Sequence, residues 1–312
     1  MNDPVLSYRP KRSDRLIQCV AASGMIRVVL IDGTNLVKEA RRVHGLSRVA
    51  TAALGRQLMM TAIMAADLKG CDDLISTVIK GDGPAGTMIC TGNSRVEVKG
   101  SVLNGDVELP PTPEGKLDVG GFVGHNGKLS VIRDMGLKEP YTGLCNLVSG
   151  EIAIDFANYY AASLQRPALV YLGVREDAKN GNVRAAAGIF AEPLPGCPDE
   201  EIDRLQSLSE PIAGLSERMD AGETLDSFLM RVFEPLKIEK VGECEPKYVC
   251  DCTRQRVERA LISLGRAEMN DMIEQDHGAE VSCRFCDRIY HFTQEELERL
   301  LESATTKKDE TK

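Results

Sequence analysis

The chain has 312 residues, which is enough for two or three domains with a substantial core. It contains no tryptophan and few aromatic residues, so we expect a core of aliphatic side chains and methionine. A formal net charge of −9 argues against a nucleic-acid-binding protein, which normally carries a basic face. No apolar run typical of a signal peptide or a membrane span is present, so we expect a cytoplasmic protein without nucleic-acid or membrane partners.

Short apolar segments separated by turn residues predict a mixed β-sheet domain over residues 1–196. Strands are expected at 15–20, 25–30, 74–79, 87–91, 95–99, 117–119, 128–132, 168–174 and 183–190. The dipeptides Gly92-Asn93, Asn126-Gly127 and Asn180-Gly181 are typical of hairpin turns between such strands.

Three helices are expected in the same domain, at 35–44, 47–70 and 152–164. Ser47 is a suitable N-cap for the second, whose faces are nearly all apolar or small. A helix that is apolar on all sides is normally buried. The sequence therefore predicts an α+β domain in which sheets cover a central buried helix.

A helical linker is predicted over residues 197–243. The proline-rich run at 193–198 interrupts the first domain, and amphipathic helices are expected at 199–208 and 224–233. The linker looks too small to fold alone, so we expect it to dock on the first domain. Its second helix carries an apolar stripe, which consists of Leu225, Phe228, Leu229, Val232 and Phe233.

The last part of the chain predicts a small metal-binding domain over 244–304, followed by a polar tail at 305–312. Its cysteines form two close pairs with the spacing C-x-C-x30-C-x2-C, namely Cys250, Cys252, Cys283 and Cys286. Two such pairs can supply the four thiolates of a closed tetrahedral zinc site, with zinc–sulfur distances of roughly 2.3 Å. No coordination position remains open, so we expect one structural or regulatory zinc ion per chain.

Around these cysteines, helices are expected at 253–264, at 267–275 and after a capping box formed by Thr293 and Glu296. A hairpin is expected at 280–292, with the second cysteine pair in its turn and Tyr290 and Phe292 packed behind it. So few large apolar residues make a thin core, and zinc would add on the order of 10 kcal/mol to its folding. Cys244 could be a spare ligand or a resolving thiol.

The segments CDCTRQRVERAL (250–261) and VSCRFCDRIYHF (281–292) resemble the zinc-binding region of the redox-regulated 33-kilodalton heat-shock chaperone family. Further similar segments follow in the family's order, so the resemblance covers nearly the whole chain; they lie at 54–56, 79–86, 140–143, 150–153 and 172–174. The chain departs from the usual pattern at Leu164, Ala187 and Thr253, and none of these is a cysteine.

The resemblance implies an ATP-independent holdase rather than an enzyme, inactive while it is reduced and zinc-bound. Oxidation would close the disulfides Cys250–Cys252 and Cys283–Cys286 and release the zinc ion. The linker would then unfold, and its apolar stripe would bind unfolded client proteins and prevent their aggregation. The resemblance also implies a homodimer in the active form.

Two other functions are compatible with the cysteine pattern. A constitutive zinc-ribbon binding module would use the same ligands, although the acidic charge disfavours nucleic acid as its partner. A thiol–disulfide oxidoreductase would use Cys283 and Cys286, although such enzymes place the first cysteine at a helix start rather than in a hairpin.

Overall fold

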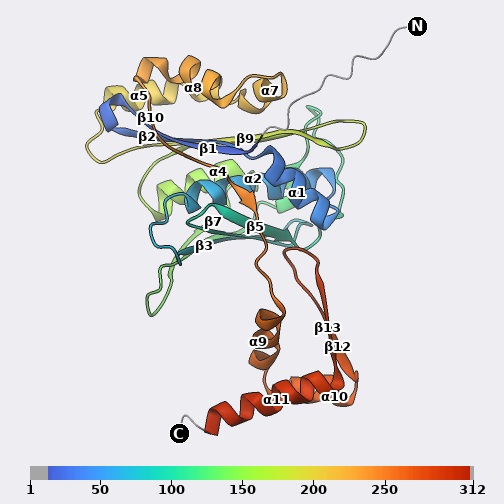
Figure 1. The fold of residues 1–312 in the computed structure, drawn as a ribbon. Coiled ribbons are helices and arrows are strands. Elements are labelled where there is room, and N and C mark those ends of the chain that lie inside the picture. Colours follow the sequence, from blue (N-terminus) through green and yellow to red (C-terminus); the bar gives the residue numbers. More distant parts are fainter. Residues whose placement is uncertain (1–12, 310–312) are drawn as a thin grey trace. The chain divides into compact units, whose positions relative to one another are not determined.

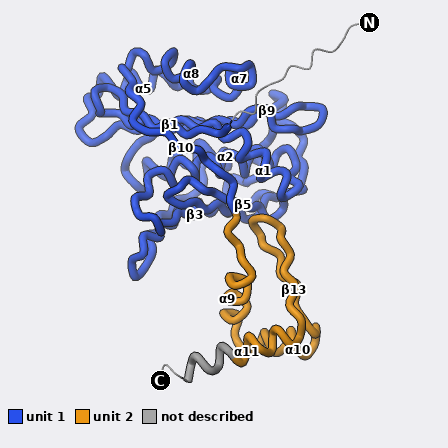
Figure 2. The backbone as a smooth tube through the Cα atoms, viewed as in Figure 1, with its two compact units in different colours: residues 1–249 blue, residues 250–312 orange. Residues whose placement is uncertain are grey.

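The computed structural model describes residues 13–309, with side chains to Glu302, and divides into two compact units (Figure 2). The first unit is 1–249 and the second is 250–312. The predicted linker, 197–243, is thus grouped with the first unit, and the division falls between Val249 and Cys250. Within the described residues, no helix is long and apolar enough to cross a bilayer.

The first unit is built on two sheets that lie in separate layers (Figure 1). The five-stranded sheet has the order β10-β1-β2-β9-β8, with all neighbours antiparallel. Its strands are β1 (Arg15–Ala21), β2 (Ile26–Asp32), β8 (Leu169–Glu176), β9 (Val183–Pro193) and β10 (Glu239–Cys244). A short 3-10 turn, η1 (Ala22–Gly24), joins β1 to β2.

The six-stranded sheet has the order β11-β5-β4-β3-β6-β7. It is antiparallel except at its edge, where β11 pairs parallel with β5. Its strands are β3 (Leu74–Gly81), β4 (Thr87–Asn93), β5 (Glu97–Val102), β6 (Gly127–Asp134), β7 (Tyr141–Asn146) and β11 (Lys247–Tyr248).

Helices fill the space between these sheets (Figure 1). They are α1 (Thr34–His44), α2 (Arg48–Ala65), α3 (Val119–Val123), α4 (Ile152–Asn158) and the π-helical turn η2 (Tyr159–Ser163). Every residue of α2 except Arg48 and Arg56 is buried, which confirms the predicted central helix. Ser47 Oγ accepts a hydrogen bond from the Ala50 N–H at 3.2 Å, so the predicted N-cap is confirmed as well.

Three local predictions are wrong. Gly92-Asn93 is not the hairpin turn, because both residues belong to β4 and the turn to β5 follows at 94–96. The strand expected at 117–119 is instead the start of α3, because the Asp118 carboxylate accepts from the Gly121 N–H at 2.8 Å and caps a helical turn. Asn126-Gly127 is not a hairpin turn, since Gly127 begins β6 and the element before it is α3. The strand β6 forms its hairpin with β7, which the sequence did not reveal.

The linker helices cover the outer face of the five-stranded sheet (Figure 1). They are α5 (Asp199–Ser207), α6 (Ser209–Ile212), α7 (Leu215–Asp220), α8 (Leu225–Phe233) and η3 (Glu234–Leu236). Their apolar side chains share a core with Ile17, Val28 and Ile189 of the sheet, so the predicted docking is confirmed. The whole predicted stripe is buried in this core, and its members are Leu225, Phe228, Leu229, Val232 and Phe233.

The second unit is three helices and one hairpin. Its elements are α9 (Arg254–Leu264), α10 (Arg266–Glu274), β12 (Gly278–Ser282), β13 (Ile289–Thr293) and α11 (Gln294–Asp309). Thr293 and Glu296 exchange backbone-to-side-chain hydrogen bonds of 3.0 and 3.4 Å, which confirms the capping box. The core is thin, as expected, and its buried members are Val257, Leu261, Ile273, Tyr290, Phe292 and Leu297.

Candidate metal centre

The two cysteine pairs stand on different local structures. Cys250 and Cys252 lie just before α9, whose N-cap is Thr253. Cys283 and Cys286 lie in the turn between β12 and β13. The Cys283 carbonyl accepts from the N–H groups of Cys286 and Asp287, at 3.2 and 2.8 Å, and this tight turn brings the two cysteines close together. Asp287 has a left-handed backbone with φ of 54°, which closes the turn.

Folding brings the four sulfurs together. All four Sγ atoms lie within 4.8 Å of one another. The Sγ atoms of Cys250 and Cys283 are 3.6 Å apart, and those of Cys252 and Cys286 are 3.3 Å apart. A tetrahedron with zinc–sulfur bonds of about 2.3 Å has sulfur–sulfur edges of about 3.8 Å. The cluster therefore has the size of a four-thiolate metal site, and a soft donor set of this kind suits zinc.

Burial and hydrogen bonds give Cys250, Cys252 and Cys286 different pKa values. Burial raises the pKa of Cys250 and of Cys286 above the usual thiol value. Burial also acts to raise the pKa of Cys252, but hydrogen bonds from Tyr290 and the other thiols outweigh it and lower that pKa to about 7. Cys252 is therefore more readily deprotonated at neutral pH than Cys250 or Cys286.

Tyr290 links the hairpin to the first cysteine pair. Its hydroxyl donates to Cys252 Sγ at 3.2 Å and lies 3.1 Å from the Cys252 carbonyl oxygen. The sequence predicted that Tyr290 packs behind the turn, and the side chain is indeed buried. Its contact with a sulfur was not predicted, because it joins residues 38 positions apart.

Arg254 fixes the start of α9 on the same hairpin. Its guanidinium lies over the Phe292 ring at 4.2 Å from the centroid, and Nη1 donates to the His291 carbonyl at 3.0 Å. Nη2 pairs with Glu296 at 2.7 Å. These contacts hold the segment that carries Cys252 close to the strand that carries Tyr290.

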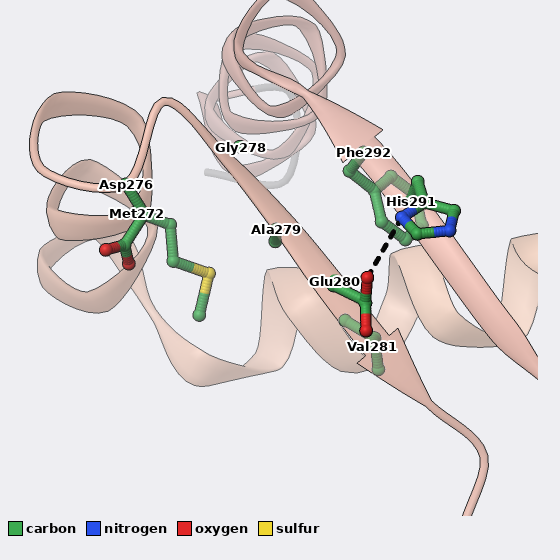
Figure 3. Close-up of a pocket in the computed structure, with 8 residues that line it drawn as sticks. All are labelled: Met272, Asp276, Gly278, Ala279, Glu280, Val281, His291 and Phe292. Atoms are coloured by element: carbon green, nitrogen blue, oxygen red, sulfur yellow. Dashed lines mark ion pairs between the residues drawn. The ribbon is translucent and has the colours of Figure 1, made fainter. Parts of the chain in front are cut away.

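The same unit contains an open pocket of about 510 Å³ beside the hairpin (Figure 3). Met272 and Phe292 give it apolar walls, and His291 Nδ1 lies 3.3 Å from Glu280 Oε2 at its rim. None of the four clustered cysteines lines this pocket. The pocket is therefore separate from the cysteine cluster.

The other candidate residues lie elsewhere. Cys244 is in β10, opposite Leu16 of β1, and the cluster found among residues 13–302 consists of the four paired cysteines alone.

Sequence reasoning missed how firmly the chain is held just before Cys250. The Tyr248 hydroxyl donates to the Gly100 carbonyl at 2.9 Å and lies 3.0 Å from His44 Nε2. The Val249 N–H donates to the Val98 carbonyl at 2.9 Å. This hydrogen bond to the six-stranded sheet lies one residue before the first clustered cysteine. These contacts are long-range, and no local pattern signals them.

Comparison with known proteins gives a consistent match. The family model for Hsp33 protein matches residues 14–293. The "33 kDa chaperonin" of Desulforamulus reducens is 41% identical over 288 residues, which cover 92% of this chain and 97% of that protein. The protein of the same name from Alkaliphilus metalliredigens is also 41% identical, over 93% of this chain and 99% of that one.

A solved structure agrees with the sequence matches. The crystal structure of the 33 kDa chaperonin (heat shock protein 33 homolog) from Thermotoga maritima superposes with a TM-score of 0.84 at 34% identity. The match covers 95% of this chain and 100% of that one. With its family model, its relatives and its fold in agreement, the chain belongs to the Hsp33 family.

Proposed function

We propose that this protein is a redox-regulated, ATP-independent holdase whose activity is controlled by the cysteine cluster. Relatives over nearly the whole length are named chaperonins, which supports a chaperone rather than an enzyme. The observation that carries the regulatory part is the convergence of four thiols within 4.8 Å of one another. The four thiols are all the cysteines of the second unit, and the apolar core of that unit is thin.

The proposed ligands are Cys250, Cys252, Cys283 and Cys286. A zinc ion bound by them would keep all four as thiolates, which are the form that reacts with oxidants. Two thiolates then lose two electrons and form one sulfur–sulfur bond. Hydrogen peroxide accepts these electrons, its O–O bond breaks, and with two protons it leaves as two water molecules. Once the sulfurs have joined in pairs, they can no longer hold the ion.

The proposed disulfides are Cys250–Cys252 and Cys283–Cys286, one within each local segment. Such a pairing separates the segment before α9 from the hairpin turn. In the structure, sulfur–sulfur distances of 3.6 and 3.3 Å instead join cysteines of different pairs, Cys250 to Cys283 and Cys252 to Cys286. A crossed pairing would keep the two segments joined, so peptide mapping of the oxidised protein distinguishes the two arrangements.

Unfolding of the second unit would free the linker. While that unit is folded, the chain is restricted on both sides of the Val249–Val98 hydrogen bond. Once the second unit unfolds, the chain after Val249 is no longer restricted. Detachment of β11 and β10 then frees a longer stretch of chain and gains more conformational entropy. Detachment of α5 to α8 then exposes the apolar stripe, and unfolded client proteins bind to it. We place this activity in the cytoplasm, with the active form a homodimer.

The test follows metal release and client aggregation together after peroxide is added. In the wild-type protein both should change with the same time course. Cys283→Ser removes one ligand and one disulfide, so it should bind metal weakly and lose peroxide-dependent control of aggregation. Cys71→Ser is the matched control, because Cys71 is exposed and outside the cluster. Normal switching by Cys283→Ser would contradict the proposal.

A further inference from the structure

We infer that the edge of β1, which β10 covers, is a binding site for one extended segment of an unfolded client. The client would take the place of β10 and add a strand to the five-stranded sheet. This inference rests on the proposed holdase function. The client backbone would bind to β1, and this contact would add to the binding of client side chains to the apolar surface that the linker helices uncover.

The strand β10 is held mainly by its backbone. It pairs with β1 from Leu16 opposite Cys244 to Val20 opposite Glu239, with an irregularity between Gln18 and Cys19. No residue of β10 is fully buried, and Val241, its one branched apolar side chain, is 62% exposed. Removal of β10 therefore costs little apolar burial.

The strand β1 does not depend on β10 for its position. Leu16 and Ile17 are fully buried and belong to the cores on opposite faces of the sheet. On its other side β1 pairs with β2 along seven residues. After β10 detaches, β1 would remain an ordered strand with unpaired N–H and C=O groups along one edge. Such an edge pairs readily with another extended chain.

One arginine couples the release of β10 to that of the linker. Arg15 of β1 bonds to Glu243 of β10 with its Nε at 2.5 Å, and to Asp226 of α8 with its Nη1 at 2.5 Å. The helix α8 is joined to β10 only by η3 and two further residues. Departure of this segment would therefore open the β1 edge and the apolar sheet face beside it together.

The residues along this edge favour a client strand in which every second side chain is apolar. Ile17 and Cys19 of β1 face the core that α8 covers, and their partners on β10 are Glu243 and Lys240. Charged residues on an edge strand discourage pairing with other chains. A client strand with apolar side chains at these two positions would instead bury them against the exposed face. The occupant is thus an extended polypeptide with apolar residues at every second position.

The first experiment uses a fluorescent peptide of about ten residues in which valine and threonine alternate. Its twin has the same side chains but is N-methylated at two adjacent central amides, which blocks both edges of the strand. Oxidised wild-type protein should bind the unmodified peptide at least about tenfold more tightly, because backbone hydrogen bonds are lost in the twin. Hydrogen exchange should show amides of β1 losing protection on oxidation and regaining it with the peptide. Equal affinity for the two peptides would overturn the inference.

The second experiment ties β10 to β1. Val20→Cys with Glu239→Cys places two thiols at directly opposed register positions, neither of them fully buried. With the cross-link verified by peptide mapping, the oxidised double variant should bind the peptide at least about tenfold more weakly than either single variant. Unchanged peptide affinity in the cross-linked protein would overturn the inference.

The outcomes separate this inference from the proposed function. If oxidised wild-type protein prevents client aggregation but does not discriminate between the peptides, the holdase stands and the β1 site is wrong. If the oxidised protein holds no client at all, the proposed function fails, and the β1 site fails with it.

Discussion

Tyr290 is the side chain through which the hairpin acts on the thiols. Its hydroxyl donates to Cys252 Sγ at 3.2 Å, a bond that favours the thiolate. Replacement of a group that hydrogen-bonds to a metal ligand typically weakens metal binding by roughly 10- to 100-fold. We therefore expect Tyr290→Phe to weaken zinc binding by about tenfold, measured by competition with a chromophoric chelator.

The control for this prediction is Tyr141→Phe. It removes the same hydroxyl from a half-exposed tyrosine of β7, which belongs to the first unit, whereas the cysteine cluster belongs to the second. This variant should bind zinc like the wild type. Equal affinity in Tyr290→Phe and Tyr141→Phe would show that the hydroxyl does not act on the cluster.

Glu243 makes the attachment of β10 dependent on pH. Hydrogen bonds from Arg15 and then from Lys240 lower the pKa of Glu243 to about 2, below its usual value of 4.5. The folded state therefore binds the carboxylate's proton less tightly than the unfolded state does. Its contribution to stability is fully present above pH 4.5 and is lost as the pH falls towards about 2.

Glu243→Gln should remove this pH dependence. Because the side chain is 32% exposed, solvent screening limits the effect to about 1 kcal/mol or less. Urea unfolding at about pH 6 and about pH 3.5 measures it, as the difference between wild type and variant at each pH. The variant should be less stable than the wild type at the higher pH and closer to it at the lower pH. A difference that stays constant would contradict the assignment.

At the scale of elements, the proposed regulation depends on the docking of α8 on the five-stranded sheet. Phe228 is fully buried against the five-stranded sheet, whereas Met230 of the same helix is 61% exposed. Truncation of a buried phenylalanine costs about 3–5 kcal/mol. Phe228→Ala should therefore loosen the linker and give the reduced protein some ability to prevent client aggregation.

Met230→Ala is the matched control in the same helix. It removes a side chain that is largely in solvent, so the reduced protein should stay inactive. Aggregation of a thermally unfolded client, followed by light scattering, compares the two variants. If reduced Phe228→Ala were as inactive as Met230→Ala, docking of α8 would not be what keeps the protein inactive.

Elements with strong local signals were predictable from the sequence. The cap at Ser47 and the box at Thr293 and Glu296 lie where the pattern predicts them, because capping depends on neighbouring residues. The apolar run of α2 identified the central helix for a similar reason. At Asp118 the local signals conflicted, and a side-chain cap favoured a helical turn over a strand.

The strands that were missed are edge strands. In β7, β10 and β11 few side chains are buried, so no alternation of apolar and polar residues marks them. Their pairing depends on where distant strands lie. The same holds for the site: spacing predicted the four cysteines, but the contacts of Tyr290 and Tyr248 depend on tertiary structure.

At the scale of the whole molecule, the two units have very different means of stabilisation. The first has extensive cores on both faces of its five-stranded sheet, whereas the second has one small core. A metal bound by four thiolates would thus contribute a large share of the second unit's stability. Chelation of the reduced protein should unfold residues 250–293 and leave the inner strands of the two sheets, such as β2, β9, β3 and β4, intact. If circular dichroism showed that chelation removes the β-sheet signal as well, this division would be contradicted.

The most direct measurement of the central claim is hydrogen exchange of the reduced, zinc-loaded protein and of the same protein after peroxide. We expect oxidation to remove protection from residues 250–293 and from α5 to α8, while β2, β9 and α2 keep theirs. The loss should accompany zinc release and the appearance of client binding. An oxidised, metal-free protein that retained the protection of α8 would contradict the account.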